Sequence, residues 1–217
     1  MIFSSFSVSI LIFFAVVNSK TICDDLDGKS RNGVLFLKES KKPYTGRSLC
    51  IWDINNTVWY EGNYKDGLKE GVWTFYNIDS TKKSEINYEN GKMNGCWKRY
   101  YKNGQLRLIG YYKDGKEDGL SQYYYENGQL KTKGQFKDGK VDGLWQDYYE
   151  NGQLEYKGIF RDGEPDGHSE SYYENGQLRN KGNWKNGIPD GLWEDYFEND
   201  QLRLTGKYKF GKRDGLW

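Results

Sequence analysis

A histidine beside a serine is the first place where this chain could carry chemistry. His168 is the single histidine of the 217 residues, and Ser169 follows it directly. A serine and a histidine act as nucleophile and base only when they share a proton. Both residues lie in a segment that reads as a β-strand, where neighbouring side chains point to opposite faces. We therefore expect no nucleophilic catalysis at this pair and no enzymatic activity for the chain.

Acidic residues in glycine-rich loops are a second candidate. Asp162 and Asp166 stand four residues apart beside glycines, and the pattern recurs at Asp114 and Asp118 and at Asp138 and Asp142. Calcium needs six to eight oxygen ligands, which such loops do not supply. Aspartate in loops usually bonds its own backbone. We expect no metal and no cofactor, with a calcium loop as the alternative.

Three cysteines bear on the compartment of the protein. Cys96 takes a repeat position that leucine or valine holds elsewhere, so it is expected to act as a small hydrophobic residue. Cys23 and Cys50 remain, 27 positions apart. In an oxidising compartment they can form a disulfide, and two free thiols are the alternative.

The first 19 residues have the pattern of a secretory signal peptide. They carry no charged side chain, and the run from Val8 to Val17 is almost wholly apolar before small and polar residues. Cleavage after Ser19 would release a secreted, periplasmic or cell-surface protein. A signal-anchored membrane protein is the alternative, because the segment lacks the usual positive charge near its start.

Composition excludes several classes of protein. The 32 Lys and Arg residues balance 31 Asp and Glu, and this net charge of +1 gives no support for nucleic-acid binding. Alanine occurs once and glycine 27 times, which argues against a helical bundle. Aromatic residues make up 17% of the chain and supply area for burial. The composition favours a β-protein.

A period of 24 residues dominates the chain. The glycine of an Asn-Gly-Gln-Leu motif falls at 104, 128, 152 and 176, and Asp200 takes its place in the last copy. Six units fill residues 71–214, after a lead of residues 20–42 and a degenerate unit at 43–70, and residues 215–217 form a terminal stub. With no helix between units, we expect an all-β fold: an elongated single antiparallel sheet of tandem hairpins.

Each unit has the sequence of a hairpin. In residues 143–166 we expect Asn151-Gly152 to form a two-residue type I′ turn. This turn would place Tyr149 opposite Leu154, Asp147 opposite Tyr156 and Trp145 opposite Gly158. The connecting stretch 137–143 and its equivalents, two of which contain Pro165 or Pro189, are expected to be turn and not strand.

One face of the predicted sheet is aromatic. A recurring strand glycine faces several of its tryptophans, which suggests that the indole lies on the bare backbone. A single-layer sheet has nothing evident to cover this face, so it either packs on itself or binds a partner. The opposite face is polar, with Glu170 expected opposite Lys181. The candidate partner-binding residues are Trp73, Trp97, Trp145, Trp193, Tyr101, Tyr125, Tyr149 and Tyr173.

The pattern Gly-x-Trp-x-x-Tyr-Tyr-x-Asn-Gly-Gln-Leu, followed by Gly-x-Tyr-x-Asp-Gly, resembles the variant class of MORN repeats over residues 43–217. The resemblance implies an elongated hairpin stack that serves as a binding or assembly module, associated in some members with phospholipid membranes. Bacterial variant arrays are often labelled YwqK-type antitoxins, which implies a cytosolic partner.

These observations favour a non-enzymatic exported repeat protein that acts as a protein-interaction or scaffold module through its aromatic face. The partner expected is an unidentified protein, with a second copy of the chain among the candidates. One alternative is a peripheral membrane protein that binds anionic phospholipid, because the polar face carries a column of lysines. The other is an antitoxin-like protein that binds its partner.

Overall fold

The computed structural model describes residues 21–217, and the predicted leader lies outside them. No helix in this part of the chain is long and apolar enough to cross a membrane. The short helix α1 (Asp24–Asp27) and a small two-stranded sheet, β1 (Gly28–Arg31) with β2 (Val34–Leu37), come first. Everything after them belongs to one sheet, so the fold is the predicted all-β hairpin array.

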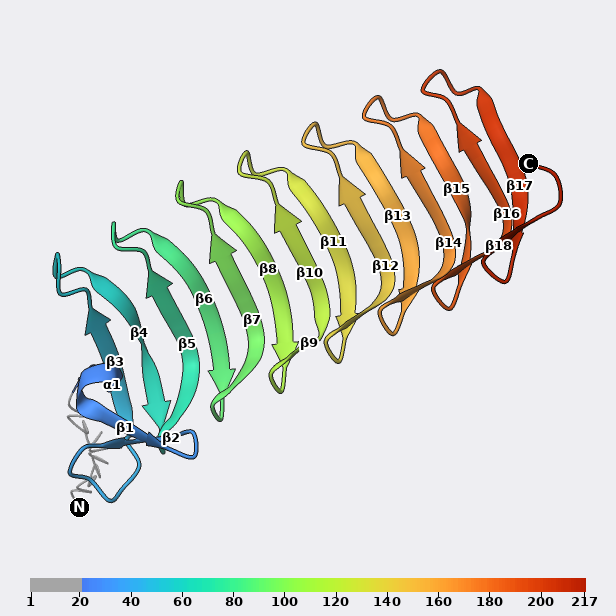
Figure 1. The fold of residues 1–217 in the computed structure, drawn as a ribbon. Coiled ribbons are helices and arrows are strands. Elements are labelled where there is room, and N and C mark those ends of the chain that lie inside the picture. Colours follow the sequence, from blue (N-terminus) through green and yellow to red (C-terminus); the bar gives the residue numbers. More distant parts are fainter. Residues whose placement is uncertain (1–20) are drawn as a thin grey trace, which may run out of the picture.

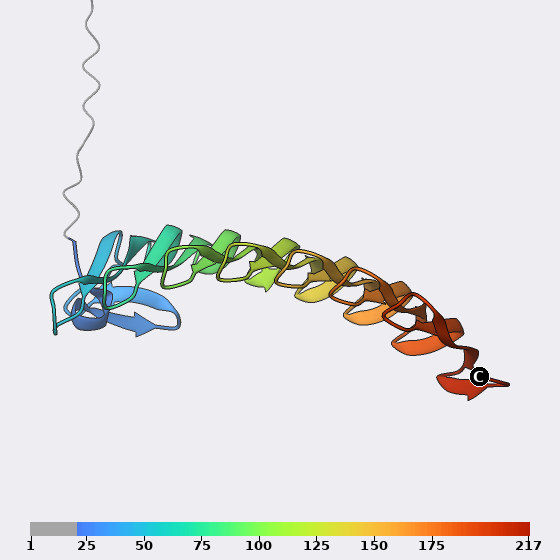
Figure 2. The same cartoon turned by 90° about the horizontal axis from the view of Figure 1, so that it is seen from above.

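The main sheet is a single antiparallel layer of sixteen strands whose order follows the chain (Figure 1). Seen from above, the sheet is long and bends gently along its length, with β1 and β2 beneath one face at the N-terminal end (Figure 2). The strands β9 and β10 both pair with β8 and act as two parts of one strand. The strands are β3 (Gly46–Ile51), β4 (Val58–Lys65), β5 (Leu68–Tyr76), β6 (Lys82–Glu89), β7 (Lys92–Tyr100), β8 (Leu106–Lys113), β9 (Lys116–Glu117), β10 (Gly119–Tyr124), β11 (Leu130–Lys137), β12 (Lys140–Tyr148), β13 (Leu154–Arg161), β14 (Glu164–Tyr172), β15 (Leu178–Lys185), β16 (Ile188–Tyr196), β17 (Leu202–Lys209) and β18 (Lys212–Asp214).

The Asn-Gly motif forms a three-residue turn, so the predicted two-residue turn is wrong. Gly152 donates its N–H to the carbonyl of Tyr149 at 2.9 Å, and Tyr149 donates to the carbonyl of Gln153 at 2.8 Å. Gly152 has a φ of 86°, whereas Asn151 keeps a negative φ and accepts a hydrogen bond from the N–H of Gln153. This is the hairpin loop in which only the last residue needs a left-handed backbone.

The register of the hairpin follows from this turn. Trp145 pairs with Gly158 and Asp147 with Tyr156, as predicted. A bulge then intervenes, so Tyr148 pairs with Leu154 and the predicted pairing of Tyr149 with Leu154 is wrong. The bulge absorbs the extra residue that a three-residue turn introduces.

Two-residue turns do occur, but at the opposite edge of the sheet. Asp138 and Gly139 have φ values of 51° and 85° and connect the paired residues Lys137 and Lys140. The expected loop at 137–143 is therefore mostly strand β12. The prolines of the equivalent stretches, Pro165 and Pro189, likewise lie in β14 and β16. The ladder shifts register close to each proline, and it does so at the same place in β12, which has Val141 instead. The repeat therefore offers an irregular position at which a residue without an N–H is tolerated.

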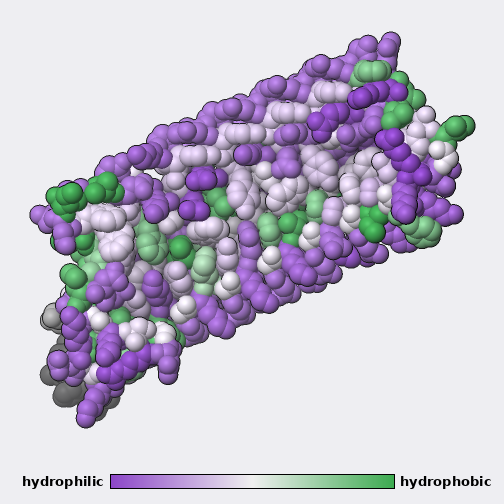
Figure 3. Space-filling view, viewed as in Figure 1, coloured by the Kyte–Doolittle hydropathy of each residue, from purple (hydrophilic) through white to green (hydrophobic). Residues whose placement is uncertain are grey.

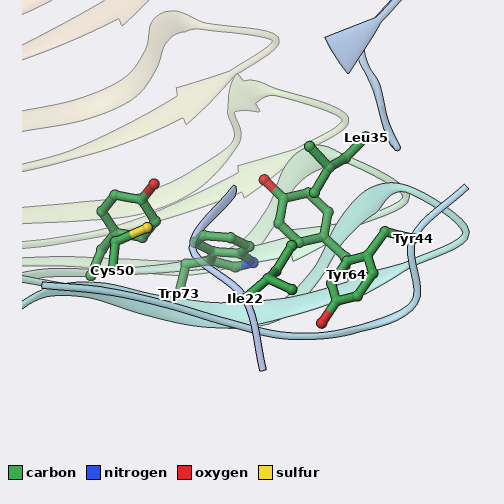
Figure 4. Close-up of a cluster of buried hydrophobic side chains, with 7 residues drawn as sticks. Ile22, Leu35, Tyr44, Cys50, Tyr64 and Trp73 are labelled. Carbon is green, nitrogen blue, oxygen red and sulfur yellow. The ribbon is translucent and has the colours of Figure 1, made fainter. Parts of the chain in front are cut away.

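The described chain has one conventional hydrophobic core, and it lies at the N-terminal end. The lead packs Ile22 and Leu35 against the first strands of the sheet, where Trp73 is fully buried (Figure 4). A disulfide joins Cys23 to Cys50 in β3 and fastens the lead to the sheet. The other core residues are Tyr44, Tyr60 and Tyr64.

Beyond this core the array has no second layer. Within the described residues after Trp73, Leu108 is the one buried hydrophobic side chain. The other aromatic side chains of the array are half-buried at best. Each unit is therefore held mainly by its two neighbours in the sheet.

Candidate functional site

A row of tryptophans marks one face of the sheet, called here the indole face. Its members recur every 24 residues along the strands, and serine takes the place of tryptophan at Ser121 and Ser169. Trp145 lies over Gly134, where an added Cβ would come within 2.2 Å of the ring. The same contact joins Trp73 to Gly62, Trp193 to Gly182 and Trp217 to Gly206.

The indole lies on a glycine, as predicted, but the predicted glycine is the wrong one. Trp145 has two register partners, Gly134 on β11 and Gly158 on β13. The expectation placed the indole on Gly158, within the same hairpin. The indole instead covers Gly134, which belongs to the preceding unit. The tryptophan thus joins two units rather than closing its own hairpin.

Neighbouring side chains fill the face where tryptophan is missing. The hydroxyl of Tyr156 lies over Gly158, and Ser169 accepts a hydrogen bond from Nε1 of Trp184 at 2.9 Å. Gly110 is approached by the hydroxyl of Ser121. The indole face is therefore continuous, packed by contacts within the array.

Edge-to-face ring pairs connect the tryptophans with a second aromatic column. The ring centroids of Trp97 and Tyr112 are 5.4 Å apart, and those of Trp193 and Trp184 are 5.3 Å apart. Such pairs add to the free energy of burial and fix the ring orientations. Trp97, Trp145 and Trp193 are half-buried and present part of each ring to the surface, whereas Trp73 lies under the lead.

The four candidate tyrosines have a structural position of their own. Each lies at a three-residue turn and donates its hydroxyl hydrogen to a backbone carbonyl of the next unit: Tyr101 to Tyr124, Tyr125 to Tyr148, Tyr149 to Tyr172 and Tyr173 to Tyr196, at 2.7–2.8 Å. These tyrosines therefore connect consecutive three-residue turns along one edge of the sheet, whereas the tryptophans lie on the face of the strands.

The opposite face carries a network of charges, called here the charged face. Lys157 and Lys181 form ion pairs with Glu170 and Glu194, each at 2.7 Å. Glu170 and Lys181 are register partners, as expected, although each makes its ion pair with another neighbour. Burial opposes ionisation of Glu170, but hydrogen bonds from Lys157, Tyr172 and His168 outweigh it and lower the pKa to about 2.

An apolar column on the charged face was not anticipated. Its members precede the tryptophan position of each unit, so strand alternation turns them to the other side of the sheet. That spacing was the signal available in the sequence. Val72, Leu120, Leu144 and Leu192 are 42–58% exposed. Figure 3 shows one face of the molecule, with hydrophilic residues along both long edges and paler and hydrophobic residues between them.

His168 and Ser169 lie on opposite faces. His168 contacts Asn183 at 3.2 Å and Glu170 at 3.0 Å, whereas Ser169 bonds Trp184. In the aspartate loops, Asp166 forms an ion pair with Arg161 at 3.2 Å. The described residues contain no group of three His, Cys, Asp or Glu side chains that could hold a metal ion.

The geometry defines an open, single-layer repeat protein in which each 24-residue hairpin packs on the next. The MORN repeat variant family matches five tandem segments, at 93–114, 117–138, 141–162, 165–186 and 189–210, which together make up half of the chain. The chain belongs to the MORN repeat variant family. The matched segments keep the 24-residue spacing seen in the sheet.

No curated protein matches the chain. Among solved structures, an S. aureus TarM mutant in complex with fondaparinux, alpha-GlcNAc-glycerol and UDP aligns at 15% identity over 55% of this chain and 19% of that chain, with a TM-score of 0.24. A second TarM structure aligns at 16% identity over 54% of this chain and 20% of that chain, with a TM-score of 0.22. The chain spans about a fifth of the length of both, and similarity at this level supports no inference on function.

Proposed function

We propose that this chain is a non-enzymatic exported interaction module that binds a protein partner on the indole face between Trp97 and Trp193. Repeats of this family generally serve as protein- or membrane-interaction modules, which supports an interaction role. The main support is that the lead segment of the chain already covers one tryptophan of the row, Trp73, and buries it fully.

The contact between the lead and the sheet indicates how a partner would bind. Ile22 and Leu35 belong to one buried cluster with the aromatic side chains of β4 and β5, and they are 2% and 6% exposed. The backbone of Ile22 also bonds that of Arg47 and Leu49 at the edge of the sheet. A partner that presents short aliphatic side chains would make similar contacts along Trp97, Trp145 and Trp193, where part of each ring remains at the surface.

Serine substitutions test this proposal without disturbing the fold, because serine is the natural residue at Ser121 and Ser169. We expect Trp145→Ser with Trp193→Ser to abolish capture of the partner by the mature protein in extracts of the exporting host. The matched control is Leu144→Ser, which changes the charged face and should leave capture intact. Equal capture by both variants would contradict the proposal, and so would a wild type that retains no partner.

Membrane binding is the second candidate, favoured by Phe210. This residue is 85% exposed at the tip of the last two-residue turn, where other units have Asp or Asn, and Lys209 and Lys212 flank it. An exposed aromatic ring beside lysines suits the interface of an anionic bilayer. Sedimentation with phosphatidylserine vesicles at low salt tests this role. Phe210→Asp should abolish pelleting, and a wild type that stays in the supernatant would exclude membrane binding.

The leader distinguishes export from the antitoxin alternative. N-terminal sequencing of the protein recovered outside the cytosol should begin at Lys20. A chain retained in the cytosol with residue 1 intact would favour a cytosolic partner instead.

A further inference from the structure

We propose that the hairpin β7–β8, together with its neighbours, holds a binding site for a small ligand that bears clustered phosphate or sulfate groups. A pocket of about 330 Å³ lies between β6, β7 and β8, at the edge of the sheet that carries the three-residue turns. Four cationic side chains line it, together with Glu126, Asn77 and the rings of Tyr100 and Tyr101. The four are Lys83, Arg99, Lys102 and Arg107.

The cationic groups are held in place and outnumber the acidic groups near them, which are Glu126 in the lining and Asp79, whose pKa is lowered mainly by hydrogen bonds from Thr81 and also by the charge of Lys102. The guanidinium groups of Arg99 and Arg107 lie 5.7 Å from the ring centroids of Trp97 and Tyr101, which orients both side chains. Among the described residues, none of the four cations makes an ion pair within 4 Å. By contrast, Lys157 and Lys181 of the charged face are each paired with a glutamate. The pocket therefore has an excess of positive charge on a chain whose net charge is only +1.

The charge arises where this unit departs from the repeat. Lys102 occupies the position of Glu126, Glu150, Glu174 and Glu198 in the later units. Arg99 takes the position that is tyrosine at Tyr123 and aspartate at Asp147 and Asp195. Neither cation is needed by the hairpin, because the later units form the same hairpin without them.

The charges around the pocket favour a small anion over an anionic membrane surface. Lys102 stands at one end of an edge whose next four positions are glutamates, so a flat anionic membrane laid along this edge would meet repulsion. A small ligand inside the pocket avoids those carboxylates. Arginine recognises phosphate or sulfate by paired hydrogen bonds, and two arginines with two lysines suit a ligand with two or more such groups. The tyrosine rings offer a surface for the carbon frame of the ligand.

Calorimetric titration of the mature protein with inositol hexakisphosphate and with sucrose octasulfate tests the site. We expect saturable binding of at least one of them that weakens as salt rises. Lys102→Glu and Arg99→Tyr restore residues found at these positions in other units, so both variants should fold, and each should weaken binding at least tenfold. Arg203→Gln is the matched control, because Arg203 shares the repeat position of Arg107 but lies far from the pocket.

Saturable binding of either ligand that is lost in Lys102→Glu and Arg99→Tyr supports the site. Failure of both soluble ligands to bind, or an equal loss in Arg203→Gln, would overturn the proposal. Binding to vesicles that contain phosphorylated inositol lipids without binding to either soluble ligand would also overturn it. Lys102→Glu should leave partner capture intact, so this site and the proposed function can fail separately.

Discussion

The two ends of the molecule bury the same repeat position to different degrees. In the N-terminal region, residues 21–75, the lead forms a second layer and Trp73 is 0% exposed. In the array that follows, Trp145 and Trp193 make the same contact with a glycine but stay half-buried, because nothing in the described residues covers them. The comparison shows that the indole face becomes a true core only when a second segment lies on it.

We therefore expect the N-terminal region to make a concentrated contribution to the free energy of unfolding. The contribution of the array should be spread evenly over its units. The N-terminal region combines a packed core with a disulfide. The array relies on contacts that recur once per unit, such as the hydrogen bond from the hydroxyl of Tyr149 to the next unit. In a repeat protein of this kind, the total is close to a sum of nearest-neighbour terms.

The largest expected effect is the loss of Trp73. Trp73→Ala should lower the free energy of unfolding by about 3–5 kcal/mol, because it leaves a cavity among fully buried rings. Trp193→Ala, its counterpart in the array, should cost about 1–2 kcal/mol because part of the ring already faces solvent. Urea unfolding followed by circular dichroism measures both. Equal losses would show that the lead adds nothing to the burial of Trp73.

The disulfide comes next. Replacement of Cys23 and Cys50 by alanine frees a loop of 27 residues, which corresponds to about 3.5 kcal/mol in the chain-entropy treatment. Hydrogen exchange should increase in residues 21–51 and stay unchanged beyond β6. Cys96→Ser, which removes the free cysteine, is the control. An increase spread over the whole array would mean that the two regions unfold as one unit.

Within the array, the contact between indole and glycine can be tested by a paired substitution. Gly134→Ala brings a Cβ within 2.2 Å of Trp145 and should destabilise the protein by about 2 kcal/mol. In a chain that also carries Trp145→Ser the clash is absent, so Gly134→Ala should cost little beyond the loss that Trp145→Ser causes by itself. Urea unfolding of the two single variants and the double variant gives the coupling energy. Additive effects would contradict the contact.

The fold could be predicted from the sequence because the same hairpin pattern recurs in each unit. The 24-residue period, the hairpin and the pairing of Trp145 with Gly158 in register all follow from strand alternation and turn chemistry. The choice of turn was wrong because Asn151-Gly152 and Asp138-Gly139 are both typical of two-residue turns. At Asn151 the loop has three residues, and the bulge beside Tyr148 accommodates the extra one.

Three other features could not be predicted from the repeat pattern. Trp145 has a glycine on each side, and pairing alone does not say over which of them the ring lies. The burial of Trp73 depends on a lead that lies outside the repeat, so the pattern of the units contains no trace of it. The basic pocket needs side chains from adjacent hairpins, and its sequence signal is the departure of Lys102 from a column of glutamates.

The smallest expected effect concerns acid and the charged face of the array. The pKa of Glu170 is about 2 in the folded protein, well below its ordinary value of 4.5. Its ion pair therefore stabilises the fold above pH 4.5, and this contribution disappears as the pH falls toward 2. With the side chain 20% exposed, the contribution should be about 1 kcal/mol after screening.

Glu170→Gln should lower the free energy of unfolding by that amount at pH 6 and by almost nothing near pH 2. Urea unfolding across this range gives the difference between variant and wild type. Glu198→Gln, at an exposed turn, should show no such difference. Because Glu170 belongs to the array, the loss on acidification should appear in hydrogen exchange of β13 and β14 while the N-terminal region stays protected. A uniform loss along the chain would mean that the array transmits the broken ion pair to the core around Trp73.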